Sequence, residues 1–246
     1  MRKKAIKELL KCNLPKSLLF NFKMLPFREA VKLPILFYGK TDFRSLKGTV
    51  RINGPVSTAM IRVGVKDEYV DTTISNTIWT INGTIVFNGP LKIWRGSYVL
   101  VAHNAELNIG SKGTKLGSKI IIMCFDSIKI GDCARVAWEC QIYDTSFHYL
   151  EYVDSNKEIQ PLTAPVIIGD RVWLGNRSTV AKGAIIPSDT IVASNSLVNK
   201  DFSHLEPYSM IAGAPAVLKV SGIRRVYDGK YQRELDEKFG YSRTGL

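Results

Sequence analysis

Residues 168–201, IGDRVW LGNRST VAKGAI IPSDTI VASNSL VNKD, repeat with a period of six. Each block opens with an aliphatic residue, followed by a small or turn-forming one. A period of six matches neither the 3.6-residue period of a helix nor the two-residue period of a single strand. It predicts a solenoid of short flat strands that stack aliphatic side chains inward from each side. The six opening residues are Ile168, Leu174, Val180, Ile186, Val192 and Val198.

The same spacing continues upstream in shorter runs. These runs are Phe87, Ile93, Val99 and Ala105, then Leu116, Ile122 and Ile128, then Ile130, Val136 and Ile142. Their β-branched and aromatic content favours strands. We therefore predict an all-β fold, with one β-helix over residues 46–220, a basic and partly helical cap over 1–45, and a C-terminal extension over 221–246. A short helix is expected over 227–239, with Asp228 as its N-cap and Gly240 after its end.

A loop over 143–166 interrupts the repeat. A long loop inside a compact repeat is usually functional. It contains His148, one of three histidines in the chain. Imidazole titrates near neutral pH, so His148 suits the role of a base toward a hydroxyl, the alternative being a hydrogen-bonded surface histidine. Asp144 either orients that imidazole or caps a turn of the loop itself.

Three segments together resemble a known family: the repeat block, QIYDTSFHYL at 141–150, and YSMIAGAPA at 208–216. They resemble the hexapeptide-repeat acyltransferases, in the sugar and polysaccharide O-acetyltransferase branch near the maltose and galactoside acetyltransferases. The resemblance covers about residues 85–220. It implies a left-handed parallel β-helix, a homotrimer with active sites between chains, and acetyl transfer from acetyl-CoA to a sugar or glycan hydroxyl in a cell-surface polysaccharide or lipopolysaccharide precursor.

The resemblance also implies roles for individual residues. His148 matches the family's general base, and Glu139 stands where a residue orients the base or the sugar. The coenzyme A arm would lie in a groove between two chains, although coil corners need small residues without any ligand. The departure of the exit GAPAVLKV at 213–220 from the usual GNPAKVIR affects the phosphate contacts. The positions that match the groove are Trp173, Gly175, Ala181, Ala193, Ser194, Lys200, Pro215 and Lys219.

Other functions on the same fold stay open. The same base would serve N-acylation of an amino sugar, and a non-catalytic scaffold is a further alternative. A zinc hydrase needs converging imidazoles, whereas His103, His148 and His204 are widely spaced, so we expect no metal. A sugar nucleotidyltransferase carries a nucleotide domain that residues 1–84 do not show.

Charge and cysteine content limit the cellular location and the binding partners that we expect. The chain of 246 residues has a net charge of +12, and residues 1–51 hold 13 Lys and Arg against three acids, a net +10. This region is either a solvated surface or a face for anionic lipid or glycan. No groove-reading motif suggests nucleic acid. Four cysteines without CxxC spacing and an interrupted N-terminal apolar run favour a cytoplasmic protein, with peripheral contact at the inner membrane face as an alternative.

Overall fold

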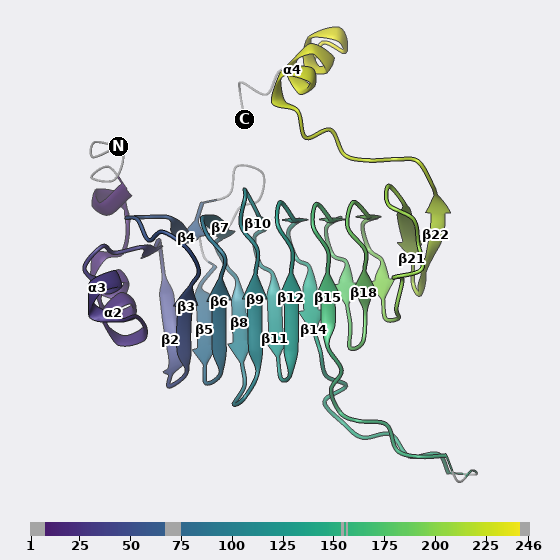
Figure 1. Cartoon of the computed structure of the whole chain (residues 1–246), viewed down its shortest axis with the longest axis horizontal. Helices are drawn as coiled ribbons and strands as arrows, with labels where there is room; N and C mark the ends of the chain where they lie inside the picture. The colour runs from purple at the N-terminus through teal and green to yellow at the C-terminus, as the bar shows by residue number, and fades with distance from the viewer. Residues whose placement is uncertain (1–7, 67–74, 154, 156, 242–246) are drawn as a thin grey trace.

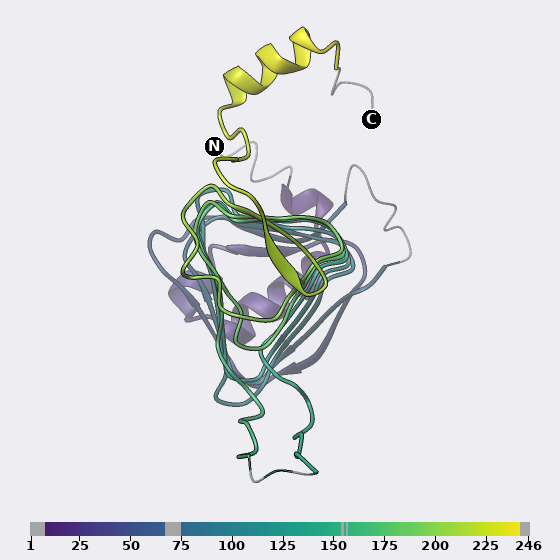
Figure 2. The same cartoon turned by 90° about the vertical axis from the view of Figure 1, so that its right-hand side faces the viewer.

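The computed structural model describes residues 8–66, 75–153, 155 and 157–241. The chain winds into a left-handed parallel β-helix with a triangular cross-section (Figures 1 and 2). Successive strands fall on three sheets in turn, which we name sides A, B and C, so that each coil runs A, B, C. The predicted fold class is confirmed.

The strands are short, and the bounds follow the chain. Side A contains β1 (Ile35–Phe37), β4 (Ile61–Val65), β7 (Leu91–Trp94), β10 (Lys115–Leu116), β13 (Arg135–Val136), β16 (Trp173–Leu174), β19 (Ile191–Val192), β21 (Met210–Gly213) and β22 (Ala216–Val220). Side B contains β2 (Thr41–Leu46), β5 (Thr77–Ile81), β8 (Tyr98–Val101), β11 (Ile121–Cys124), β14 (Gln141–Tyr143), β17 (Thr179–Val180) and β20 (Leu197–Val198). Side C contains β3 (Thr49–Ile52), β6 (Thr84–Phe87), β9 (Glu106–Ile109), β12 (Ser127–Ile130), β15 (Val166–Ile168) and β18 (Ile185–Ile186).

The aliphatic residues that open each block form the core. Ile168 pairs with Ile186 on side C, and Leu174 pairs with Val192 on side A. These pairs are one coil apart, and all six opening residues are buried. The upstream runs are buried as well, from Phe87 through Ile142. The six-residue period therefore identifies the inward-facing position of each side.

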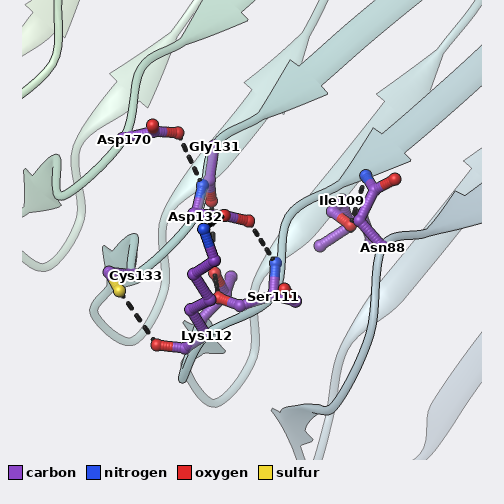
Figure 3. Close-up of polar contacts among 9 residues, drawn as sticks. Asn88, Ile109, Ser111, Lys112, Gly131, Asp132, Cys133 and Asp170 are labelled. Atoms are coloured by element: carbon purple, nitrogen blue, oxygen red, sulfur yellow. Dashed lines mark hydrogen bonds and ion pairs between the residues drawn. The ribbon is translucent and has the colours of Figure 1, made fainter. Parts of the chain in front are cut away.

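Hydrogen bonds between successive coils hold the corner that joins side C to side A (Figure 3). The backbone N–H of Ser111 donates to the Asp132 carboxylate at 2.7 Å, and the N–H of Asp132 donates to Asp170 at 2.8 Å. The N–H of Asp170 in turn donates to the Ser188 hydroxyl at 2.9 Å. A Cβ atom on Gly131 would lie 2.5 Å from both the Asp170 carboxylate and the backbone of Gly169. This corner therefore requires glycine for close stacking of the coils.

Two helices cover the N-terminal end of the β-helix (Figure 1). These are α2 (Leu14–Met24) and α3 (Phe27–Ala30). Phe20 of α2 packs against the rings of Phe37 and Trp79, with centroids 4.8 and 5.6 Å away. The Asn21 side chain bonds both backbone groups of Ile35, at 2.6 and 3.2 Å. Strands β1 and β2 thus begin inside the range that we assigned to the cap, because α2 supplies the contacts that the weak local repeat lacks.

The C-terminal end closes with a hairpin and a separate helix. Strand β22 runs antiparallel to β21 at the edge of side A. Helix α4 (Gly229–Lys238) follows, and the Asp228 carboxylate caps it by accepting from the N–H groups of Lys230 and Tyr231. Gly240 adopts a φ of +66° just after the helix, so the prediction for this segment is confirmed. Across the described part of the chain, no helix combines the length and apolarity needed to cross a bilayer.

Candidate active site

An arm leaves the corner between sides B and C. It comprises residues 144–165, between the end of β14 and the start of β15, and it projects away from the β-helix in both views (Figures 1 and 2). At its root the N–H of Ala164 donates to the Asp144 carbonyl at 3.0 Å, and the N–H of Ser146 donates to the Leu162 carbonyl at 2.9 Å. The arm therefore begins as a short antiparallel pair, at the point where the six-residue period stops.

Asp144 anchors the arm to the preceding coil. Its side chain is fully buried, and its two carboxylate oxygens accept the backbone N–H groups of Phe125 and Asp126, each at 2.8 Å. This arrangement differs from both roles that we considered from the sequence, because the partners belong to another coil rather than to His148 or the loop's own turn. Burial, reinforced by the nearby charge of Asp144, raises the pKa of the Cys124 thiol.

His148 lies on the exposed part of the arm close to this root. The backbone N–H of His148 donates to the Ser146 carbonyl at 2.7 Å, which sets the local turn. The preceding residue, Phe147, adopts a φ of +60° and packs its ring against Phe125 and Tyr143, at 5.8 and 5.9 Å. The backbone at His148 is thus held in place while its imidazole faces solvent.

Glu139 lies at a different corner of the same chain. It sits between β13 and β14, where side A meets side B. Its carboxylate accepts a hydrogen bond from Arg177 at 2.8 Å and lies 3.9 Å from the ammonium group of Lys119. Within one chain, Glu139 and His148 therefore occupy opposite ends of side B.

Four of the eight residues predicted to contact coenzyme A lie at this same A/B corner. Gly175 and Ala193 directly follow β16 and β19 of side A, and the Ser194 hydroxyl donates to Asn176 at 2.7 Å. Pro215, which follows a cis peptide bond, lies in the hairpin that ends side A. A Cβ on Gly175 would lie 2.5 Å from the Ser194 nitrogen, so packing alone already requires this glycine.

The other predicted contacts lie elsewhere. Ala181 and Lys200 follow β17 and β20 at the B/C corner, where the arm leaves the β-helix. The Lys200 ammonium lies 5.2 Å above the Phe202 ring. Lys219 is exposed on β22, and Trp173 is half-exposed on β16. The structure therefore places the predicted site residues at the A/B corner, at the B/C corner and on side A itself.

A cavity of about 340 Å³ at the third corner was not expected from the sequence. Arg171 makes a two-pronged ion pair with Asp189, at 2.6 and 2.7 Å, and this pairing raises the pKa of Arg171. Arg225 lies 5.8 Å from the Trp173 ring, and the Tyr227 hydroxyl donates to the Arg171 carbonyl. The pair Arg224–Arg225 was the available sequence signal, but its position over this corner depends on the path of the chain after β22.

Among the described residues, no three His, Cys, Asp or Glu side chains converge as a metal site. The buried cysteines are also poor nucleophiles. Burial raises the pKa of Cys140 to about 11, and the pKa of Cys124 is raised further. Because the thiolate is the reactive form, neither side chain is suited to form a covalent intermediate near neutral pH.

Comparisons with known proteins bear on this site. No family model matches the chain. A probable acetyltransferase of Mycobacterium tuberculosis is 30% identical over 115 residues, which are 47% of this chain and 37% of that protein. WbbJ of Escherichia coli, assigned to lipopolysaccharide biosynthesis as an O-acetyl transferase, is 30% identical over 113 residues, 43% of this chain and 56% of WbbJ. The chain resembles hexapeptide-repeat acetyltransferases. The resemblance inferred from the sequence is confirmed, over a part of these relatives' length.

Solved structures with a similar fold include two enzymes named for polysialic acid. The O-acetyltransferase OatWY matches with a TM-score of 0.49 and 23% identity, covering 82% of this chain and all of that one. The acetyltransferase NeuO matches with a TM-score of 0.47 and 18% identity, covering 80% of each chain.

Proposed function

We propose that this protein transfers an acetyl group from acetyl-CoA to a hydroxyl group of a sugar in a cell-surface polysaccharide or lipopolysaccharide precursor, in the cytoplasm. The observation that carries the proposal is the arm at the B/C corner, which interrupts the six-residue repeat and presents His148 to solvent. Sequence similarity to acetyltransferases supports the reaction class. The similarity to WbbJ supports a cell-surface glycan as the acceptor.

The proposed reaction is a direct transfer between two bound substrates. The His148 imidazole accepts the proton of the acceptor hydroxyl, and the oxygen attacks the carbonyl carbon of the thioester. The carbon–sulfur bond then breaks, and the departing thiolate takes the proton back from the imidazolium. General-base assistance of this kind contributes about 10²–10⁴-fold in rate. A backbone N–H directed at the carbonyl oxygen would stabilise the developing charge.

The division of site residues between two corners supports an assembled active site. Between Gly175 and Ala181 the chain turns at residues 176–177 and then crosses side B in β17, so the two groups lie at the two ends of that side. We propose a homotrimer in which the arm of one chain meets the A/B corner of the next. Exposed apolar side chains on the arm support such a contact. They are Phe147, Tyr149, Leu150, Tyr152 and Val153.

In this assembly acetyl-CoA is a substrate held at the A/B corner. Small residues along the coil edge permit close approach of the pantetheine arm, and the exposed part of Trp173 offers an apolar surface. The cationic groups of Lys200 and Lys219 would meet the phosphates. Within one chain, Glu139 and His148 lie at opposite ends of side B. Glu139 would therefore orient the acceptor, or the His148 imidazole, of a neighbouring chain.

The test is acetyl-CoA turnover by the purified protein across nucleotide sugars, lipid-linked oligosaccharides and amino sugars. We expect His148→Ala to lower kcat by at least about a hundredfold with an unchanged melting temperature. His103→Ala, at an exposed position two coils earlier on the same corner, is the matched control. A loss below about tenfold would exclude His148 as the base.

Product chemistry separates the alternatives. An acetyl ester is cleaved by mild alkaline hydroxylamine, whereas the amide formed on an amino sugar resists it. Absence of CoA release with every acceptor in the panel would instead support a non-catalytic scaffold. Sedimentation equilibrium tests the trimer, because a fully active monomer would contradict a site shared between chains.

A further inference from the structure

Helix α2 is apolar on both of its faces. One face packs into the β-helix through Phe20 and Met24. The opposite face carries Leu14, Leu18 and Phe22 at positions i, i+4 and i+8, and all three are exposed. The solvent-facing side of a surface helix is normally polar, whereas the outer face of α2 presents these apolar side chains to solvent.

The exposed apolar surface extends beyond α2. The rings of Phe22 and Phe27 lie 6.1 Å apart, which joins α2 to α3. Phe27 is 73% exposed and Leu10 is 83% exposed, and both belong to the same N-terminal segment as α2. We name this surface the N-terminal apolar face. Its residues are Leu10, Leu14, Leu18, Leu19, Phe22, Phe27 and Val31.

Cationic side chains accompany this face. Between residues 8 and 32 there are five Lys and Arg and only two acids, Glu8 and Glu29. Glu8 is already engaged, since its carboxylate pairs with Arg62 at 3.3 Å and accepts the Tyr38 hydroxyl. The five cations are Lys11, Lys16, Lys23, Arg28 and Lys32.

Charge selects the partner of the N-terminal apolar face. A second copy would bring one strongly positive end against another, and juxtaposed like charges oppose association. An anionic bilayer offers both an apolar layer and negative head groups, the combination that binds amphipathic helices lying in the interface. We infer that the N-terminal apolar face docks the protein on the surface of an anionic membrane.

The position of the docking surface is compatible with an acceptor that is bound to the same membrane. Helices α2 and α3 lie at the end of the β-helix opposite to β21 and β22, and the arm projects from the body between those ends (Figure 1). Docking through that end leaves the arm uncovered. The inference goes beyond the proposed function and does not require it, because binding to a membrane is measured without any turnover.

Co-sedimentation of the full chain with phosphatidylcholine vesicles, with and without phosphatidylglycerol, tests the inference. We expect binding to the anionic vesicles that weakens as salt is raised. The variant Leu18→Ser/Leu19→Ser/Phe22→Ser should bind at least about tenfold more weakly, because it removes apolar groups from the interface. The matched control, Leu218→Ser/Ile223→Ser/Phe239→Ser, alters exposed apolar residues of the C-terminal segment and should bind like the wild type.

A second variant covers the case in which the serine variant does not fold. Lys11→Gln/Lys23→Gln/Lys32→Gln changes only exposed side chains and should reduce binding to anionic vesicles at least about tenfold. Equal binding of neutral and anionic vesicles would overturn the inference, as would unchanged binding of a folded serine or glutamine variant. A protein that self-associates through this face without binding vesicles would show that a second copy is its partner.

Discussion

The carboxylate of Asp144 accepts a hydrogen bond from the backbone N–H of Phe125 at 2.8 Å, so the root of the arm is tied to the coil before it. The second oxygen accepts the N–H of Asp126 at the same distance. Two main-chain donors of a corner thus depend on one buried side chain. This relationship gives Asp144 a structural role that is separable from catalysis.

Replacing Asp144 with Asn tests that role. The amide keeps one acceptor oxygen but turns an NH₂ group toward the second N–H, which leaves a buried donor unpaired. We expect a loss of about 1–3 kcal/mol in the free energy of unfolding, measured by urea denaturation. At a temperature where the variant is folded, kcat should fall by less than about tenfold. Unchanged stability with a hundredfold loss of kcat would instead mean that Asp144 acts on His148.

Gly175 offers a test of packing against ligand binding. A methyl group at this position would lie 2.5 Å from the Ser194 nitrogen, against backbone that cannot move without separating two coils. Gly175→Ala should therefore destabilise the protein by about 1–3 kcal/mol or more. Gly229→Ala is the control, because the nearest atom lies 3.8 Å away and alanine favours the helix that begins there. A variant that keeps its stability but loses affinity for coenzyme A would show that Gly175 is needed only by the ligand.

The role of the Glu139 carboxylate in the reaction can be tested separately from its ion pairs with Arg177 and Lys119. Arg177 and Lys119 are both partly exposed, so each pair should contribute less than about 1 kcal/mol to stability. Arg177→Gln and Lys119→Gln keep the carboxylate and should leave kcat/KM nearly unchanged. If Glu139 orients the acceptor from a neighbouring chain, Glu139→Gln should lower kcat/KM at least about tenfold. Equal kinetics for all three variants would remove Glu139 from the site.

Buried thiols predict a loss of stability at alkaline pH. The folded protein holds the pKa of Cys140 at about 11, against an ordinary value of 9.0. Above pH 9 the unfolded chain therefore binds fewer protons than the folded one, and the free energy of unfolding falls as pH rises toward 11. Cys140 alone contributes on the order of 2–3 kcal/mol to this decrease.

Urea midpoints measured from pH 8 to 11 check this prediction. Cys140→Ala is less stable at pH 8, because it leaves a small cavity, but its stability should fall less steeply with pH. Parallel curves for the variant and the wild type would contradict the assignment to Cys140. Cys133, which is more exposed, provides the control substitution.

The local pattern predicted some features well. The leading aliphatic residues from Ile168 to Val198 are buried, and the repeat stops where the arm begins. The C-terminal helix was also predictable, since the Asp228 cap and the following Gly240 act within a few residues of each other. In each case the signal comes from neighbours in the chain or from a regular spacing.

Contacts between coils could not be predicted from the sequence pattern. Asp144 reaches Phe125, and Glu139 reaches Arg177, through the stacking of coils whose lengths vary upstream. Strand β1 pairs with β4, and the side chain of Asn21 in α2 bonds the backbone of Ile35, a contact that no repeat indicates. Arg225 reaches Trp173 only because the chain turns back after β22.

The amino-acid sequence by itself determined which side chains face inward, because a six-residue period gives each side of the coil one aliphatic position. It also located the arm and its histidine. Only the tertiary structure decided that Glu139 and His148 stand at different corners, and that the outer face of α2 remains uncovered. These outcomes depend on where each coil turns and on which surfaces remain after packing, and both are properties of the complete stack of coils.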